Sequence, residues 1–460
     1  MHGIQFDADL ICRYDRPGPR YTSYPTVLQF TPAFGAPAYE ACVREARLQG
    51  LSSLSLYVHI PFCRSPCFYC GCNRVITRRR EVVDQYLSRL YREIEMQGEL
   101  FGREGFIEQL HLGGGTPTYP ESAQLGELIE KLGRHFNLTD SEQREYSIEI
   151  DPRTVDAEYV RALAGFGINR ISLGVQDFDP AVQEAVNRIQ SEAETISLIE
   201  AARAAGMRSV SIDLIYGLPR QTLAGFERTL RTVIAARPDR LAVYGYAHLP
   251  RMFKAQRRLP AAELPSPQLR LQLLGLSIET LTAAGYVYVG MDHFALPDDE
   301  LVRAREQRSL HRNFQGYSTR AHCDLVGLGV SAIGKIGTAY AQNFRTLPEY
   351  YAAIDSGRLP IQRGLALSRD DQIRRAVIQG LMCNEVVVFA ELEQQFGIDF
   401  RRYFAPELQR LVSLERDGLV QTAPDSIRVT DAGRLLMRNI AMVFDAFLPP
   451  PESAAHSRAI

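Results

Sequence analysis

Four cysteines lie within the ten residues from Cys63 to Cys72, and this cluster limits what the chain can be more than any other feature. Three of them, Cys63, Cys67 and Cys70, have the spacing C-x3-C-x2-C. Thiolates are the usual protein ligands of zinc and of iron–sulfur clusters. A structural zinc site normally needs four ligands, often as two short Cys/His pairs, and no second pair follows here. Three thiolates on one loop therefore favour a [4Fe-4S] cluster that leaves one iron open to another ligand.

The sequence after residue 50 predicts an α/β fold. Short apolar runs alternate with stretches of helical periodicity, and this order implies parallel strands with right-handed crossover helices. We therefore expect a partial TIM-like (βα) barrel. The predicted strands cover residues 54–60, 109–112, 146–150, 170–175, 210–215 and 240–246.

Polar or glycine residues occur where each predicted strand ends. In a barrel of this kind the chemistry lies at the carboxyl ends of the strands. Glu149 and Asp213 could instead form structural salt bridges, because an unpaired buried carboxylate is costly. The glycine run lacks the lysine of a phosphate-binding loop, so a nucleotide-phosphate site is not expected. The residues at the predicted mouth are Cys63, Gly113-Gly-Gly-Thr116, Glu149, Gln176, Asp213 and Ala247.

We expect three parts in the chain: an N-terminal arm (1–50), a catalytic domain (51–364) and a mainly helical C-terminal domain (365–460). The prolines between residues 17 and 25 prevent a regular helix in the arm. The arm is either a tail packed on the body or a flap whose Arg16 and Arg20 bind substrate carboxylates.

The C-terminal domain reads as helices followed by two short strands, a winged-helix-like pattern. Residues 365–447 contain ten Arg, no Lys and twelve Asp or Glu, so nucleic-acid binding is not expected. The whole chain has a formal net charge of −2. We find no signal peptide and no apolar run of the ~20 residues that a membrane span needs. Clustered free thiols then suggest a cytoplasmic protein, and we expect a monomer.

Several motifs resemble those of one known family. The cysteine loop is similar to that of the radical S-adenosylmethionine (SAM) enzymes, and the chain from about residue 17 to residue 440 resembles the oxygen-independent coproporphyrinogen III oxidases among them. Related haem chaperones are the alternative, but they usually lack the arm and a cysteine at the position of Cys72. A structural zinc protein is a further alternative. The motifs include His59-Ile-Pro-Phe-Cys63, Gly113-Gly-Gly-Thr116, Asp213-Leu-Ile-Tyr-Gly-Leu-Pro219 and His311-Arg-Asn-Phe-Gln315.

The resemblance implies roles for particular residues. Cys63, Cys67 and Cys70 would bind the cluster, whereas Cys72 would not. Gln315 would lie near the same mouth. The residues implied around a first SAM are Tyr57, Tyr69, Gly114, Glu149 and Ile333. Those implied around a second SAM are Gly115, Thr116, Gln176, Arg188, Asp213 and Ala247.

The resemblance also implies the reaction. A radical derived from SAM would start the oxidative decarboxylation of two propionates of coproporphyrinogen III in haem biosynthesis, giving protoporphyrinogen IX. An electron donor such as flavodoxin or ferredoxin would be needed, together with an electron acceptor that the resemblance does not identify.

Overall fold

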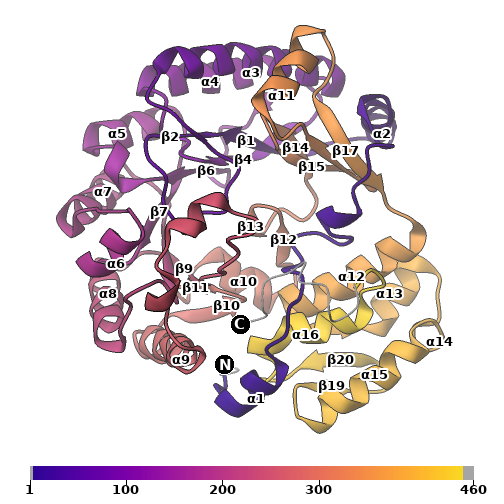
Figure 1. Ribbon diagram of the computed structural model, residues 1–460. Coiled ribbons are helices and arrows are strands. Elements are labelled where there is room, and N and C mark those ends of the chain that lie inside the picture. The colour runs from indigo at the N-terminus through magenta and orange to yellow at the C-terminus, as the bar shows by residue number, and fades with distance from the viewer. Residues whose placement is uncertain (1–3, 449–460) are drawn as a thin grey trace. The chain divides into compact units, whose positions relative to one another are not determined.

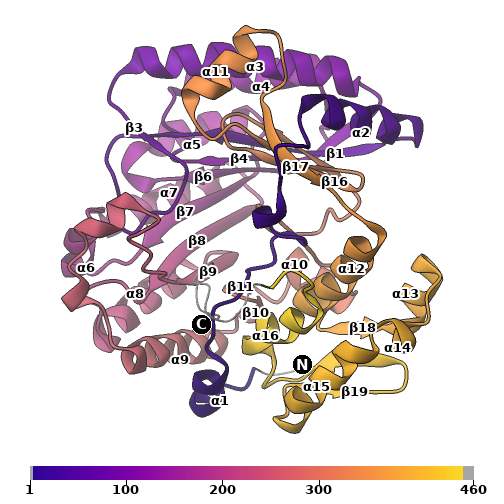
Figure 2. The same cartoon turned by 45° about the vertical axis from the view of Figure 1, so that its right-hand side comes forward.

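The computed structural model describes residues 4–448, which form two compact units (Figures 1 and 2). One unit, here called the barrel unit, consists of Phe30–Thr280 and His322–Ala366. The other, here called the terminal unit, consists, within residues 4–448, of the segment up to Gln29, Leu281–Ala321 and the segment from Leu367. Each unit therefore combines segments that are distant in the sequence.

A sheet with six consecutive parallel strands forms the centre of the barrel unit. Their spatial order is β9-β8-β7-β6-β4-β1, so each strand lies beside the one before it in the βα series. All six strands predicted from the sequence are confirmed. Their bounds are β1 Ser53–Ile60, β4 Phe106–Gly114, β6 Glu145–Ile150, β7 Arg170–Gln176, β8 Ser209–Tyr216 and β9 Arg240–Gly245.

The sheet continues on the other side of β1 with strands that the sequence did not predict. β14 (Asp324–Leu328) is parallel to β1, and three antiparallel strands follow it in the order β15, β16, β17. Their bounds are β15 Ile333–Ile336, β16 Ala339–Asn343 and β17 Ile361–Ala366. A short strand, β5 (Asn137–Leu138), pairs with the start of β4. Within this unit the strand order runs from β9 to β17 without returning, so the barrel is partial, as expected.

Helices cover the sheet because each has one apolar face. α3 (Arg80–Phe101) buries Val83, Leu87, Leu90 and Ile94 at the three- and four-residue spacing of a helix face. Figure 2 shows α3 and α4 side by side over the same part of the sheet. The other helices of the unit are α2 Ala36–Leu48, α4 Ser122–His135, α5 Ala157–Gly165, α6 Pro180–Ala185, α7 Glu192–Ala204, α8 Leu223–Ala236, α11 Leu347–Asp355 and most of α9 Pro267–Ala283.

The terminal unit combines helices with a small antiparallel sheet ordered β18-β20-β19. Stacked aromatic rings fill its core, including Phe389 and Phe400 with centroids 4.1 Å apart. Its helices are α1 Ala8–Tyr14, α10 Glu300–Glu306, α12 Arg369–Asn384, α13 Phe389–Phe396, α14 Phe400–Tyr403, α15 Ala405–Arg416 and α16 Met437–Ala441. Its strands are β10 Val287–Gly290, β11 His293–Ala295, β12 His311–Asn313, β13 Gly316–Ser318, β18 Val386–Val388, β19 Val420–Thr422 and β20 Ser426–Val429. The expected helices followed by a β wing are confirmed, with β18 as an unexpected third strand.

The two units differ from the boundaries expected at residues 50 and 364. The N-terminal arm is divided, because α2 belongs to the barrel unit, where Tyr39 donates a hydrogen bond to Gln97 on α3 (3.1 Å). The segment Leu281–Ala321, expected in the catalytic domain, belongs to the terminal unit. Residues up to 29 are held there by polar contacts such as that of Tyr21 with Asp445 (2.9 Å).

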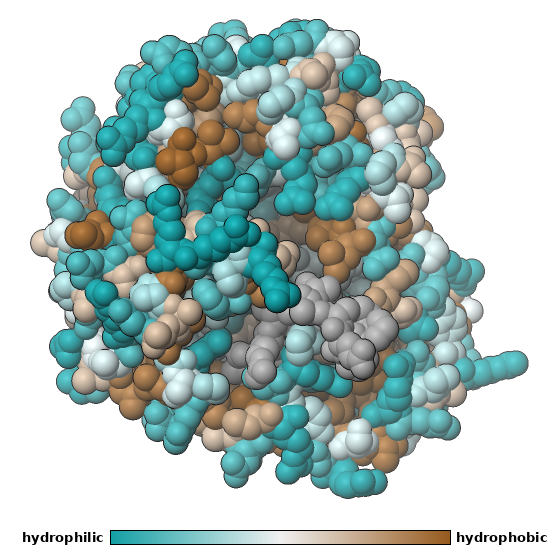
Figure 3. All heavy atoms as spheres, in the orientation of Figure 1, coloured by the Kyte–Doolittle hydropathy of each residue, from teal (hydrophilic) through white to brown (hydrophobic). Residues whose placement is uncertain are grey.

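Among residues 4–448, no helix is both long and apolar enough to cross a lipid bilayer. On the face shown in Figure 3, hydrophobic side chains lie in small groups among hydrophilic ones.

Candidate active site

A cavity of about 380 Å³ opens at the carboxyl ends of the parallel strands in the barrel unit. Residues at or just after the ends of β1, β4, β6 and β7 line it, together with Asp213 late in β8. All four cysteines of the loop line it as well. Most of the predicted site residues therefore meet at the carboxyl ends of the strands, where we expected the chemistry. Those lining the cavity are Cys63, Cys67, Tyr69, Cys70, Gly114, Gly115, Thr116, Glu149, Gln176, Arg188 and Asp213.

The cysteine loop is closed at its base by two short parallel strands. β2 (Phe62–Cys63) pairs with β3 (Val75–Ile76), which brings the two ends of the loop together. Inside the loop, the Arg74 guanidinium donates hydrogen bonds to the carbonyl oxygens of Cys70 (3.0 Å), Cys72 (3.4 Å) and Cys67 (3.4 Å). Arg74 thus fixes the backbone that carries the thiols, a role that the cysteine spacing alone could not reveal.

Polar groups from segments that follow β4, β6 and α6 donate hydrogen bonds to the thiols. Thr116 donates to Cys63 Sγ (3.3 Å), and Arg188 and Arg153 donate to Cys67 Sγ (3.4 and 3.5 Å). Burial raises the pKa of Cys63 to about 11. A hydrogen bond with Cys72, helped by the charge of Arg74, lowers the pKa of Cys70 to about 6. Cationic donors favour the thiolate, which is the form that binds metals.

A buried ion-pair cluster supports this side of the cavity. Asp151 lies 3.1 Å from Arg188 and 2.6 Å from Arg153, and the side chains of Asp151 and Arg188 are only 11% and 8% exposed. Burial alone would raise the pKa of Asp151, but the two guanidinium groups outweigh burial and lower it. Arg188 was predicted to contact SAM. Asp151 and Arg153 were missed, although both directly follow a predicted strand and that position could have singled them out.

The glycine run lets the end of β4 lie against the cysteine loop. A Cβ at Gly115 would stand 2.5 Å from the carbonyl oxygen of Pro61 and 3.0 Å from Cys63 Sγ. At Gly114 it would meet the backbone of Ile60, and the φ of +130° there also favours glycine. Only residues without a side chain can occupy these two positions.

Two carboxylates face the cavity from β6 and β8, the strands on either side of β7. Glu149 lies 3.2 Å from His111 Nε2, and its other oxygen accepts from the backbone N–H of Gly114 (3.4 Å). Asp213 accepts a hydrogen bond from Ser172 at 3.3 Å. Burial, followed by repulsion from Glu149, raises the pKa of Asp213 to about 7. Among residues 4–448, no cationic side chain lies at hydrogen-bond distance from Asp213, so the simple salt-bridge alternative does not apply to it.

Tyr57 and Ile333 lie close to one another beside the cavity rather than on its lining. The Tyr57 ring stacks on His111, with centroids 5.8 Å apart, and its hydroxyl is 3.0 Å from His59 Nδ1. Tyr57 pairs in register with Gly327, and the backbone of Ile333 packs directly against that glycine.

Ala247 is coupled to the cysteine loop through one amide side chain. Gln256 Nε2 donates to the carbonyl oxygens of both Ala247 (3.1 Å) and Tyr69 (2.9 Å). Gln176, at the end of β7, has a φ of +68°, an uncommon conformation for a residue with a side chain. Such strain is frequent where a side chain must point into a site.

Three predicted residues, Arg16, Arg20 and Gln315, belong to the terminal unit. Arg20 forms an ion pair with Asp292 there, and Gln315 lies in the turn between β12 and β13. Arg16 is exposed.

The residues of the cavity fit a [4Fe-4S] cluster with an exchangeable ligand. Three thiols come from one loop, two guanidinium groups donate to one of them, and glycines leave the space beside them open. Three thiolates with an iron–sulfur core carry net negative charge, which Arg74, Arg153 and Arg188 would offset. Among the described residues, the thiols of the loop do not form a group of three or more ligand atoms within 4.8 Å of one another, as a single zinc ion would require.

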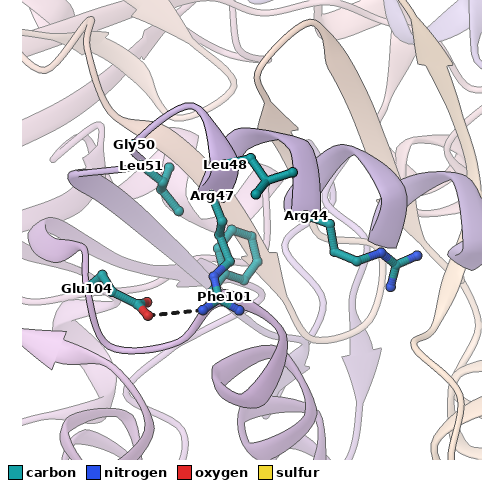
Figure 4. A pocket seen from close by; sticks show the side chains of 7 residues that line it. All are labelled: Arg44, Arg47, Leu48, Gly50, Leu51, Phe101 and Glu104. Carbon is teal, nitrogen blue, oxygen red and sulfur yellow. Dashed lines mark hydrogen bonds and ion pairs between the residues drawn. The ribbon is translucent and has the colours of Figure 1, made fainter.

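A larger cavity, about 540 Å³, lies at the opposite ends of β1 and β4 (Figure 4). Its polar groups already interact with one another, since Arg47 donates to Glu104 at 3.0 Å. It contains no thiol and no buried carboxylate, so its size does not make it the better candidate. Its lining consists of Arg44, Arg47, Leu48, Gly50, Leu51, Phe101 and Glu104.

Comparisons with known proteins identify the family of the chain. Residues 57–233 match the model of the radical SAM superfamily, and residues 367–436 match that of the HemN C-terminal domain. The chain is 52% identical over 99% of its length to an oxygen-independent coproporphyrinogen III oxidase of Pseudomonas aeruginosa, of which 99% is covered. It is 48% identical over 97% of its length to the protein of that name from Escherichia coli, with 96% of that protein covered.

A solved structure agrees over the same extent. The structure of coproporphyrinogen III oxidase (HemN) from Escherichia coli, described as a radical SAM enzyme, superposes with a TM-score of 0.92 at 47% identity. It covers 97% of this chain and 100% of that one. These relatives are named as oxidases, which favours the oxidase over the haem chaperone. The chain belongs to the oxygen-independent coproporphyrinogen III oxidase family of radical SAM enzymes.

Proposed function

We propose that this protein catalyses the oxygen-independent oxidative decarboxylation of coproporphyrinogen III to protoporphyrinogen IX. The single observation that supports this most is the three-cysteine loop facing a glycine-lined cavity at the strand ends, in a chain that matches the family over nearly its whole length. Each of two propionates would lose carbon dioxide, one hydrogen atom and one further electron, and would become a vinyl group.

Cys63, Cys67 and Cys70 would hold the cluster, and its open iron would bind the amino and carboxylate groups of one SAM. When bound, this pair supplies a 5′-deoxyadenosyl radical that removes a hydrogen atom from the propionate. The protein would orient the cofactor, exclude water and tune its electronics. Arg74 would keep the loop in shape, and Thr116 would donate to the thiolate of Cys63.

Two sets of residues around the cavity would bind two different SAM molecules. The backbone of Gly114, with Tyr57, Tyr69, Glu149 and Ile333, would surround the SAM at the cluster. A second SAM is part of the proposal, and Asp213 supports it, because a largely buried carboxylate with a raised pKa is suited to a cationic or hydrogen-bonding ligand. The other residues proposed for that second molecule are Gly115, Thr116, Gln176, Arg188 and Ala247.

Substrate carboxylates would be bound by cationic side chains of the N-terminal arm, which we propose as a cover for the site. Arg16 is exposed, whereas Arg20 already pairs with Asp292, so Arg16 is the better candidate anchor. Replacing Arg16 with Ala should weaken substrate binding without changing iron content. Unchanged binding would remove Arg16 from the proposal.

We also propose that the protein works in the cytoplasm as a monomer and receives electrons from a protein such as flavodoxin or ferredoxin. The deciding experiment is anaerobic reconstitution of the cluster, followed by SAM, a reductant, coproporphyrinogen III and an electron acceptor. Protoporphyrinogen IX formed together with methionine would support the proposal. SAM cleavage without decarboxylation, by a protein that retains haem, would contradict it.

A further inference from the structure

Two segments of the barrel unit next to the cavity carry positive charges without negative ones. Neither residues 63–80 nor residues 251–258 contain an Asp or a Glu, although the whole chain has a net charge of −2. We call their basic residues the cationic rim. The rim consists of Arg64, Arg74, Arg78, Arg79, Arg80, Arg251, Lys254, Arg257 and Arg258.

The two segments are in direct contact. The ring of Phe253 packs on Gly71, where an added Cβ would stand 3.0 Å from it. The Arg258 guanidinium lies over the ring of Phe68, 5.5 Å from its centroid. With the hydrogen bond from Gln256 to the Tyr69 carbonyl, these contacts hold residues 251–258 against the stretch that contains Cys67 and Cys70. Residues 251–258 and the cysteine loop therefore form one continuous surface.

Most of the charges on this surface are exposed and unneutralised. Within residues 4–448, no acidic side chain lies at ion-pair distance from Arg64, Arg78, Arg251, Lys254 or Arg257, and all five are exposed. Some basic groups elsewhere in the unit are paired, as Arg220 is with Glu184 and Glu263.

The rim also has an apolar contact point. Met252, between two rim residues, is 63% exposed, and Gly71 and Cys72 of the loop are exposed as well. In Figure 3, hydrophilic side chains cover much of the region where the chain leaves β9. A flexible apolar side chain among charges is suited to a transient protein contact.

We infer that the cationic rim is the docking surface for an acidic one-electron carrier protein. This inference rests on the proposed function, because only a cluster held by Cys63, Cys67 and Cys70 requires electrons at this place. One electron would leave the reduced carrier and one would enter the cluster, and no covalent bond would change. The rim reaches Gly71, the residue after Cys70, so a docked carrier would stand beside the cluster.

Charge complementarity explains why the partner should be acidic. A one-signed exposed patch attracts an oppositely charged protein, raises its association rate and orients it, and rim charges act mainly on this rate. Electron carriers form small, short-lived complexes, for which such steering is sufficient. Because salt screens exposed charges, with a Debye length of about 10 Å at 0.1 M, the effect should fade as ionic strength rises.

The test compares two double variants with the same change in charge. Arg251→Glu/Lys254→Glu alters the rim, whereas Arg161→Glu/Arg402→Glu alters exposed residues on α5 and α14. The probe is a purified acidic flavodoxin. Its dissociation constant is measured by calorimetry with the reconstituted holoenzyme, and its KM is measured in the decarboxylation assay. Parallel assays with dithionite report catalysis that needs no docking.

We expect the rim variant to raise both constants about tenfold at low salt, to lose this difference at high salt and to keep the wild-type dithionite rate. The control should resemble the wild type in every assay. Equal constants for the two variants would overturn the docking surface. Weaker binding of a DNA oligonucleotide to the rim variant, with flavodoxin binding unchanged, would also overturn it. If dithionite gives no product with any variant or with the wild type, the proposed function fails instead.

Discussion

The two cavities of the barrel unit lie at opposite ends of the same strands and differ in how their polar groups are used. At the carboxyl ends, a buried guanidinium, a carboxylate with a raised pKa and three thiols point into the space. At the amino ends, Arg47 and Glu104 satisfy one another, and the remaining lining is largely apolar (Figure 4). The polar groups of the smaller cavity thus remain available to a ligand, whereas those of the larger cavity already bind one another.

The difference follows from local packing. At the carboxyl ends, glycines allow the end of β4 to approach the cysteine loop closely, which leaves no room for side chains that would fill the site. At the amino ends, Gly50 turns the chain before β1, and an added Cβ there would meet nothing within 4 Å. Size alone therefore does not identify a site; convergent polar groups do.

The largest expected effect is on cluster binding, which should be lost when a cysteine of the carboxyl-end cavity is replaced but not when a cysteine of α2 is replaced. Cys67→Ser should abolish cluster binding and activity, because a serine hydroxyl is a poor ligand for iron in a sulfur cluster. Cys42→Ser, on α2, should leave both unchanged, and Cys72→Ser should retain the cluster. Iron and sulfide analysis with electron paramagnetic resonance of the reduced proteins would measure this. Normal iron content in Cys67→Ser would exclude Cys67 as a ligand.

The next effect compares a glycine from each end. Gly115→Ala should cost about 1–3 kcal/mol of the free energy of unfolding, because the added methyl group would collide with Pro61 and Cys63. Gly50→Ala should cost only about 1 kcal/mol, from the φ of +86° rather than from any collision. Urea unfolding of the cluster-free proteins would give both values, and iron content after reconstitution should fall only for Gly115→Ala. Equal iron content in the two variants would contradict the close-approach explanation.

The third effect compares one ion pair from each end. Arg188→Met should cost about 3 kcal/mol, since it removes a buried partner of Asp151, which is 11% exposed. Arg47→Met should cost far less, because its partner Glu104 is largely solvated. Thermal or urea unfolding of the cluster-free proteins would measure both. A similar cost for the two would mean that Arg153 alone is enough for Asp151.

Much of this comparison could be predicted from the sequence, because it depends on local patterns. Strand ends and cysteine spacing located Cys63, Cys67, Cys70, Glu149 and Asp213 correctly at one cavity. Hydrophobic periodicity also predicted the six parallel strands, because each strand is a short apolar run that is followed by a helical pattern.

The features that were missed depend on distant contacts. β14 contains Gly327 and precedes a further glycine, so the segment resembled a loop, and its parallel pairing with β1 appears only in three dimensions. Arg74 is one arginine among several in its stretch, and nothing local shows that it binds three carbonyl groups. The membership of Leu281–Ala321 in the terminal unit likewise depends on tertiary packing.

The last effect concerns pH and has opposite signs at the two ends. Asp213 has its pKa raised from 3.8 to about 7, so the folded state keeps a proton between about pH 4 and pH 7 that the unfolded chain releases. Stability contributed by Asp213 therefore falls as pH rises through this window. The side chain of Asp213→Asn cannot ionise, so the stability of this variant relative to the wild type should rise by about 2 kcal/mol as the pH rises through the same range. A pKa shift of this size could contribute at most about 4 kcal/mol. We expect less than that limit because the Asp213 side chain is partly solvated.

Glu104, at the other cavity, has its pKa lowered by a hydrogen bond to its own backbone and by Arg47. Its contribution is present above its unfolded pKa of 4.5 and is lost as pH falls below it, so Glu104→Gln should differ from the wild type only above that pH. Urea unfolding of the cluster-free proteins at several pH values would give both difference curves. Because each curve is taken against the wild type, the titration of other buried groups such as Glu93 cancels. A flat curve for Asp213→Asn between pH 4 and pH 7 would show that the carboxylate is already ionised in the folded protein, and the two ends of the barrel would then differ in packing but not in protonation.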